Sequence, residues 1–244
     1  MKSRTPEDGR DAGSPNLESL LLAIADDDRV GVREMIQKNP GLATDLVDRA
    51  RLYESKIAHW LYAKDTALHL AAAGHRAAIA RMLLAAGADP NSARNHREAR
   101  PLHYAADGYL RSPFFKATEQ IKTIRCLLRA GADLHAVDKN GATALHRAVR
   151  TRSAAAVECL LEAGANPSAR NHPGSTPFHL AVQNTGRGGS GDPAAKAAQQ
   201  RIIQSMLAHQ ASPMMKDARG KSVTDWATSP WIQQLLNEDA GRGG

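Results

Sequence analysis

Aromatic residues, cysteines and long apolar runs are all scarce in this chain of 244 residues. Only 4% of the residues are aromatic, and there are two cysteines. No run approaches the roughly 18 apolar residues that a membrane-spanning helix needs. Residues 1–15 also lack the apolar stretch of a secretory signal. We therefore expect a cytoplasmic protein that does not contact a membrane.

Motifs of the common enzyme classes are also absent. The sequence contains no nucleophile elbow, zinc-binding helix, kinase signature or P-loop. Residues 186–191 match G-x-G-x-x-G, but a nucleotide-binding fingerprint needs a preceding strand and a following helix inside a βαβ unit. We interpret this segment as a loop whose Arg187 could still meet an anion. We expect no catalytic residues, no cofactor and no enzyme activity.

What the chain does contain is one phrase, repeated. It occurs as Thr66–Ala71, Arg100–Ala105, Thr143–Ala148 and Thr176–Ala181, so the intervals between phrase starts are 34, 43 and 33 residues. The first three copies are followed by a Leu-Leu pair and a Gly-Ala-Asp/Asn ending. A fifth, decayed copy is Ser222–Ala227, in which aspartate replaces histidine. The chain is therefore a repeat protein.

The phrase and its spacing resemble the ankyrin repeat family, whose signature is Thr-Pro-Leu-His-x-Ala with a period of 33 residues. The resemblance implies an all-α repeat solenoid, an ankyrin-like stack of helix-turn-helix units joined by β-hairpin-like fingers. It also implies protein–protein recognition through the finger tips and the concave face of the first helices.

One continuous repeat domain is expected over residues 17–239, between a disordered leader at 1–16 and a flexible tail at 240–244. Leu17–Ala25 and Val30–Ile36 have the paired-helix pattern without the signature, which is typical of a terminal cap. We place the cap and the five repeats at 17–64, at about 65–98, 99–141, 142–174 and 175–220, and at 221–239.

Helix-start and helix-stop signals support this organisation. Thr176 precedes a proline, which indicates a helix N-cap followed by the first helical residue. Leu145, Ala148 and Val149 share one helix face by their spacing. Gly164 follows the second helix where a left-handed C-cap belongs. Because two helices of about ten residues cannot bury both apolar faces alone, stacking must supply the core.

The histidines and cysteines of the repeats favour structural roles. In the family that the chain resembles, the signature histidine forms hydrogen bonds near the start of the first helix. Here these histidines are His69, His103, His146 and His179. Cys126 and Cys159 occupy equivalent positions in adjacent repeats, about 10 Å apart, whereas a disulfide needs Cα atoms within about 7 Å. We expect two reduced, buried thiols and, since no partner has the required spacing, no metal site.

Three insertions interrupt the repeats. They lie within 46–65, between the cap and the first repeat, and within 109–119 and 184–194, between the two helices of the second and fourth repeats. The first contains Tyr53, Trp60 and Tyr62, and the second contains Tyr109, Phe114 and Phe115. These rings either anchor the loops or contact a partner, and one ring of a pair could do each.

The net charge of +7 raises nucleic acid, or another polyanion, as an alternative partner. The basic residues of the predicted fingers are interleaved with acidic ones, however, and dense basic runs are absent. We therefore favour an unidentified protein or peptide, preferably an acidic one, bound by a monomeric scaffold. The candidate partner-binding residues are Trp60, Tyr62, Arg94, His96, Arg97, Tyr109, Phe114, Phe115, Lys139, Arg150, Arg170 and His172.

A cleft is a further expectation. The inserts of the second and fourth repeats should emerge from the same edge of the stack, opposite the fingers, with one ordinary repeat between them. Arg147, Arg150 and Arg152 of that repeat would then form a basic floor.

Overall fold

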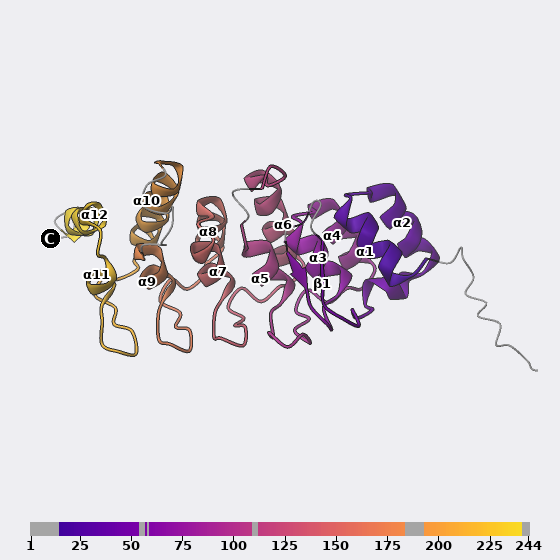
Figure 1. Ribbon diagram of the computed structural model, residues 1–244, viewed down its shortest axis with the longest axis horizontal. Coiled ribbons are helices and arrows are strands. Elements are labelled where there is room, and N and C mark those ends of the chain that lie inside the picture. The colour runs from indigo at the N-terminus through magenta and orange to yellow at the C-terminus, as the bar shows by residue number, and fades with distance from the viewer. Residues whose placement is uncertain (1–14, 54–56, 58, 109–111, 184–192, 241–244) are drawn as a thin grey trace, which may run out of the picture.

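The structure is a computed structural model that describes residues 15–53, 57, 59–108, 112–183 and 193–240. Helix pairs follow one another along the long axis of the molecule, and the loops that connect them hang along one edge (Figure 1). None of the helices in these ranges combines the length and the apolar character that a bilayer crossing requires.

Two layers of helices form the stack. The first layer contains α1 (Leu17–Ala25), α3 (Ala67–Ala73), α5 (Pro101–Ala106), α7 (Ala144–Arg150), α9 (Pro177–Val182) and α11 (Val223–Trp226). The second contains α2 (Arg29–Lys38), α4 (Ala77–Ala85), α6 (Ala117–Arg129), α8 (Ala154–Glu162), α10 (Pro193–Ala208) and α12 (Pro230–Ala240). From α1 to α11, and from α2 to α10, each helix packs against the next one in its layer. The expected solenoid is confirmed.

Three further short elements are present in the described ranges, all between the cap helices and the first repeat. They are the 3-10 helix η1 (Pro40–Ala43) and the strands β1 (Arg51–Leu52) and β2 (Trp60–Leu61). We call the pairs α3–α4 and α7–α8 the ordinary repeats, and the pairs α5–α6 and α9–α10 the inserted repeats.

The signature phrase caps the start of each first helix. Thr143 and Thr176 accept the backbone N–H groups of their signature histidines at 3.4 Å, and the Nδ1 atoms of those histidines accept the threonine N–H groups in return. Thr176 is thus the cap of a helix that begins at Pro177, as expected. At Arg100 only the histidine half of this exchange remains, because an arginine side chain has no acceptor.

The same histidines join each repeat to the next. Their Nε2 atoms donate at 3.1–3.2 Å to carbonyls at the end of the following finger, which belong to Ala99, Ala142, Ser175 and Lys221. Since Nδ1 accepts an N–H group, the proton lies on Nε2 and the ring is neutral. Burial lowers the pKa of all four, to about 4 for His146. In the terminal repeat Asp225 keeps the cap, accepting from the N–H and hydroxyl groups of Ser222 at 2.7 Å.

The two cysteines and the C-cap glycine Gly164 agree with the sequence predictions except in the burial of one thiol. Cys126 and Cys159 are both free, with Cys159 buried as expected and Cys126 only half-buried. Gly164 has a φ of 92°, the left-handed conformation that its C-cap position requires.

The fingers form a connected row. We define the first finger as residues 46–66 and the others as 89–99, 133–142, 166–175 and 212–221; together they are the finger row. In each of the last four, an Asn or Asp oxygen accepts backbone N–H groups and closes the turn. Backbone hydrogen bonds run from Lys139 to Arg97 (2.8 Å) and from His172 to Asn140 (2.9 Å), so the second, third and fourth fingers are fixed to one another.

The inserted repeats differ from the ordinary ones in both helices. Their first helices have six residues where α3 and α7 have seven, and α6 and α10 have 13 and 16 residues where α4 and α8 have nine. Residues 117–119 and 193–194, which the sequence assigned to inserts, therefore lengthen the second helices. Ala117, Glu119 and Ala194 are good helix formers, and proline is accommodated at a first helical position such as that of Pro193. Residues 109–111 and 184–192 lie outside the described ranges.

Side chains satisfy the carbonyls at the ends of the shortened helices. Gln120 Nε2 donates to the carbonyls of Ala105, Ala106 and Asp107 at 3.0–3.3 Å. At the equivalent position of the fourth repeat, Gln199 Nε2 donates to two carbonyls at the end of α9, at 2.7 and 3.2 Å. Both helix ends are thus capped from within their own repeat.

The preceding ordinary repeat caps the same ends from the other side. His75 Nε2 donates at 3.2 Å to two carbonyls at the end of α5, and the Arg152 guanidinium donates to three at the end of α9, at 2.6–3.4 Å. His75 and Arg152 lie at equivalent positions, both with positive φ, at 54° and 60°. The first helices of both inserted repeats are therefore capped by the same arrangement of donors.

Candidate partner-binding surface

The first finger is enlarged and folds back on itself. Leu46 pairs with Thr66, and the N–H of Val47 donates to the Asp65 carbonyl at 2.8 Å. Further out, β1 and β2 pair antiparallel with Leu52 opposite Trp60. Both of these side chains are exposed, at 37% and 48%. The finger thus presents an apolar pair at its surface.

Other side chains of the first finger cover the first helices of the first two repeats. Ile57 lies against the C-terminal end of α3, where a Cβ atom on Gly74 would be 2.5 Å from the Ile57 Cδ1 atom. The His59 ring lies 4.6 Å from the ring of Tyr104, which is fully buried. Leu61 is buried as well. Part of this insertion therefore packs against the stack rather than extending away from it.

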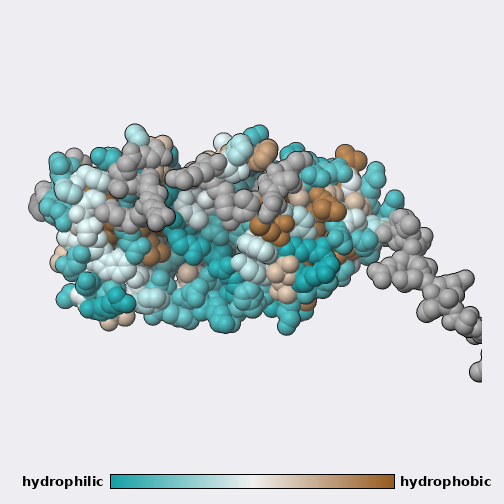
Figure 2. Space-filling view, viewed as in Figure 1, coloured by the Kyte–Doolittle hydropathy of each residue, from teal (hydrophilic) through white to brown (hydrophobic). Residues whose placement is uncertain are grey.

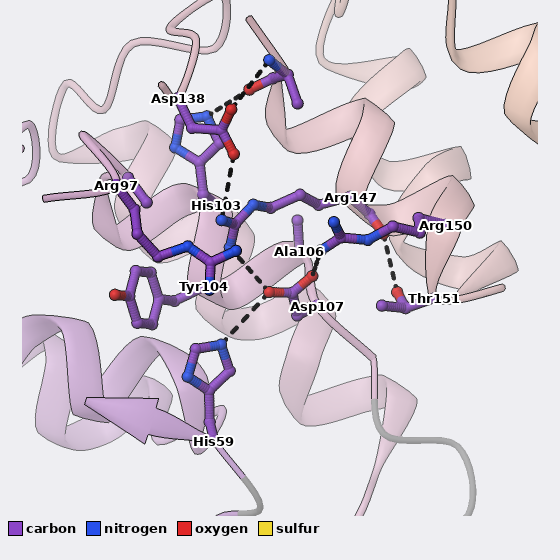
Figure 3. A network of polar contacts seen from close by, with 12 residues as sticks. His59, Arg97, His103, Tyr104, Ala106, Asp107, Asp138, Arg147, Arg150 and Thr151 are labelled. Atoms are coloured by element: carbon purple, nitrogen blue, oxygen red, sulfur yellow. Dashed lines mark hydrogen bonds and ion pairs between the residues drawn. The ribbon is translucent and has the colours of Figure 1, made fainter. Parts of the chain in front are cut away.

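A buried charge network lies where this finger meets the second and third repeats (Figure 3). Arg147 of α7 lies between two carboxylates, donating to Asp107 Oδ2 at 2.9 Å and to Asp138 Oδ2 at 3.2 Å. His59 Nε2 lies 3.4 Å from the same Asp107 oxygen, and the Arg150 guanidinium lies 3.6 Å from Asp107 Oδ1. The network connects the first finger, α5, the third finger and α7.

Neighbouring charges set the protonation states of the network. Burial by itself would raise the pKa of Asp107, but the hydrogen bond from His59 and the charges of Arg147 and Arg150 outweigh burial and lower the pKa. For Asp138, backbone N–H donors and the Arg147 charge likewise overcome burial and lower the pKa. Burial opposes the charged form of Arg147, yet the two carboxylates raise its pKa. The three groups are therefore charged at neutral pH and act as a structural clamp.

Asp107 and His59 were not predicted from the sequence as members of this network. Arg147 gave the available signal, because it occupies the signature position where the other full repeats have Leu70, Tyr104 and Leu180. A charge in a row of apolar and aromatic residues indicates a buried counter-charge. Spacing alone could not show that the partner comes from the end of α5.

The expected basic floor between the inserts is not formed. Arg147 is buried between carboxylates, and Arg152 is turned to the carbonyls at the end of α9, where burial lowers its pKa to about 10. Arg150 is the exposed member of the three and is paired with Asp107. The three arginines come from one short stretch of chain, but each serves a different neighbour.

Tyr62 of the first finger meets His96 and Arg97, which lie in the turn of the second finger, and we call these three candidate residues the aromatic–basic cluster. Arg97 Nη1 donates to the Tyr62 hydroxyl at 2.6 Å, and its guanidinium lies 5.1 Å from the centre of the Tyr62 ring. The His96 ring meets Tyr62 edge-on at 4.9 Å. These contacts hold the rings and the guanidinium in fixed positions at the surface.

The two phenylalanines of the second insert separate into different roles. Phe115 meets the His75 ring edge-on at 5.6 Å, so it anchors the insert to the preceding repeat. Phe114 is 55% exposed. Tyr109, the remaining aromatic candidate of this insert, lies outside the described residues.

The basic candidates of the later fingers also divide. Arg94, Lys139 and His172 are exposed along the finger row. Arg170 instead fastens the fourth finger to the fifth, donating to the carbonyls of Gly174 and Lys216. The face seen in Figure 2 is mainly hydrophilic along the fingers, and its larger hydrophobic patches lie toward the N-terminal end. Within the described ranges, no cluster of His, Cys, Asp and Glu could hold a metal ion.

Comparisons with known proteins agree with this architecture. The family of ankyrin repeats in three copies matches residues 114–217, and the single ankyrin repeat matches residues 64–96. A solved structure of an ankyrin repeat domain from Acinetobacter baumannii AYE is similar with a TM-score of 0.64 and 24% identity, over 92% of this chain and 99% of that one. At this identity the likeness shows the fold alone. No curated protein matches the chain.

Proposed function

The chain belongs to the ankyrin repeat family, and from this premise we propose that it is a non-catalytic scaffold that binds a protein or peptide through its finger row. Ankyrin repeats are generally protein–protein interaction modules. The observation that carries the proposal for this chain is the set of backbone hydrogen bonds between fingers, which fixes the spacing of the exposed side chains. A surface that is already ordered loses little entropy on binding.

The N-terminal end of the finger row is the best candidate for the centre of the contact. Trp60 is exposed beside Leu52, and the aromatic–basic cluster includes Tyr62 of the same finger. Tryptophan, tyrosine and arginine are the residues most enriched among side chains that dominate interface energies. Lys139 and His172 continue the surface along the row, which favours a partner with acidic side chains.

A two-stage experiment tests this proposal. Proteins captured from a native lysate by the intact chain, after nuclease treatment, are purified and titrated against the wild type and against Trp60→Ala with His96→Ala. We expect at least tenfold weaker binding by the double variant. Arg33→Ala with Arg201→Ala, on the outer helices α2 and α10, is the matched control and should bind like the wild type.

Two results would count against the proposal. Equal binding by the finger variant and the control would move the contact away from the finger row. Recovery of nucleic acid, or of proteins that disappear after nuclease treatment, would support the alternative of polyanion binding. Binding to nucleic acid would also weaken steeply between low and moderate salt.

A further inference from the structure

We propose that a groove on the outer layer, between α4 and α6, binds an acidic amphipathic helix of a protein partner. The groove has a volume of about 600 Å³ and is lined by both helices. It belongs to the second-helix layer, whereas the finger row is hydrogen-bonded to the first helices through the signature histidines. It is therefore a site separate from the proposed finger contact.

Among the described residues, four cations and no carboxylate line this groove. They are Arg81 of α4 and Lys122, Arg125 and Arg129 of α6. Lys122 is paired at 2.7 Å with Glu119 of its own helix, and Arg125 reaches away to Glu162 of α8 at 3.4 Å. Within the described part of the chain, the side chains of Arg81 and Arg129 make no hydrogen bond or ion pair, and both residues are exposed. Two positive charges thus face the groove without compensation.

The neighbouring contacts of the outer layer show that this is unusual for the molecule. Between α6 and α8, Arg125 faces Glu162; between α8 and α10, Arg201 faces Glu158 at 2.7 Å. The α4 helix contains no acidic residue at all. Like charges across one helix pair repel each other. A carboxylate of a bound partner would therefore neutralise the cations of the α4–α6 groove, as glutamates do between α6 and α8 and between α8 and α10.

The floor of the groove selects the kind of anion. Ala77 and Leu84 of α4, together with Ala130 just after α6, give it apolar surface. Burial raises the pKa of the Cys126 thiol while the charges of Arg81 and Arg129 oppose that shift, consistent with a thiol lying between the two guanidinium groups. An apolar floor between cationic rims matches a helix with an apolar stripe flanked by Asp and Glu. A nucleic acid backbone has phosphates but no apolar side chains to fill the floor.

The dimensions fit two turns of such a helix. The lining residues run from Ala77 to Leu84 on one side and from Lys122 to Ala130 on the other. At 1.5 Å per residue, these stretches are about 10–12 Å long. Side chains spaced i, i+3, i+4 and i+7 on a bound helix would therefore cover the groove from end to end.

The test uses three labelled synthetic peptides of about 18 residues, long enough to form a helix. One has a leucine stripe flanked by glutamates, the second has glutamine in place of glutamate, and the third has serine in place of leucine. We expect fluorescence anisotropy to show binding of the first peptide, and at least tenfold weaker binding of the other two. Arg81→Glu with Arg129→Glu should weaken the first peptide at least tenfold.

Arg33→Glu with Lys38→Glu is the matched control, because it changes the net charge equally at two exposed positions of α2, on the same layer and outside the groove. It should bind within about twofold of the wild type. In a Cys159→Ala background, the bound peptide should also slow the reaction of Cys126 with a thiol reagent. Circular dichroism establishes that each variant is folded.

The proposal is overturned by any of three results. The first is no binding of the glutamate–leucine peptide. The second is equal weakening by the groove variant and the control, which indicates a response to net charge only. The third is equal binding of the serine peptide, which indicates a polyanion patch. Because Trp60 and His96 lie outside the groove, their variants should bind the peptide normally, so failure here is distinguishable from failure of the finger proposal.

Discussion

The first helix ends differently in the ordinary repeats and in the inserted repeats. In the ordinary repeats, helices of seven residues turn directly into second helices of nine. In the inserted repeats the first helix stops one residue earlier, and its carbonyls accept from Gln120 or Gln199 and from His75 or Arg152. The difference teaches that an ankyrin-like unit tolerates extra chain at this turn when side chains at fixed positions satisfy the freed carbonyls.

Both kinds of repeat contain the signature histidines that join each repeat to the next, and we call these four residues the histidine ladder. Low pH should weaken the ladder and lower the stability of the protein, which is the largest effect we expect. In the folded state burial holds the pKa of His146 at about 4, below its ordinary value of 6.5. Unfolded chains bind the proton first, so stability is complete above pH 6.5 and falls as the pH drops toward 4. The loss is about 3 kcal/mol from His146 alone, and the other three signature histidines act in the same direction.

Urea denaturation at pH 7.5, 6.5, 5.5 and 4.5 measures this loss. Asp107 and Asp138 cannot produce it, because their pKa values are lowered from 3.8 and their contribution disappears only at more acidic pH. The exposed His96 and His172 provide the control, since replacing both with glutamine should leave the profile unchanged. A stability that stays flat between pH 6.5 and 4.5 would contradict a neutral, buried ladder.

Changing the residue that follows the first helix should destabilise the protein much more in the second repeat than in the fourth. Asp107→Asn leaves Arg147 buried with one carboxylate instead of two, and we expect a loss of about 3 kcal/mol in the free energy of unfolding. At the equivalent position of the fourth repeat, Gln183→Ala removes no such charge and should cost less than about 0.5 kcal/mol. Urea denaturation of both variants at pH 7.5 gives the comparison. Similar losses at the two positions would show that the network does not stabilise the fold.

The glutamine caps should distinguish inserted from ordinary repeats. Gln120→Ala removes the donor to three carbonyls at the end of α5, and we expect a loss of about 2 kcal/mol. Gln199→Ala should behave similarly at the end of α9. Gln200→Ala is the matched control, because it lies on the exposed side of the same helix. Amide hydrogen exchange should show the lost protection in α5 or α9 and not in α7, and a loss spread evenly over the stack would argue against a local cap.

Much of the fold was predictable from the sequence because it depends on local and repeated signals. The signature phrase placed the helix starts, Gly164 placed a helix end, and equivalent positions of Cys126 and Cys159 argued against a disulfide. The lengthening of α6 and α10 was not predicted. Aligning the inserted repeats with their neighbours locates the extra residues but does not show whether these residues are helical. Their helix-forming composition was the available signal.

The surface was less predictable, because its geometry depends on contacts between distant parts of the chain. Tyr62, His96 and Arg97 were all candidates, but nothing in the sequence showed that they meet. Arg170 was chosen for its charge, yet its guanidinium fastens two fingers. Charge and ring type identify residues that are able to bind a partner. The tertiary fold determines which of these side chains are already engaged in contacts within the chain.

The smallest effect separates anchoring from partner contact within the second insert. Phe115→Ala removes the edge-on contact with His75, the residue that caps α5 from the preceding repeat, and should cost about 1 kcal/mol of stability. Phe114→Ala removes an exposed ring and should change stability by less than about 0.5 kcal/mol. Thermal unfolding measures both. If Phe114→Ala then weakens binding of a captured partner while Phe115→Ala does so only in proportion to its lost stability, adjacent residues divide the two roles. If both variants bind normally, the insert serves to pack, and the contact lies elsewhere on the finger row.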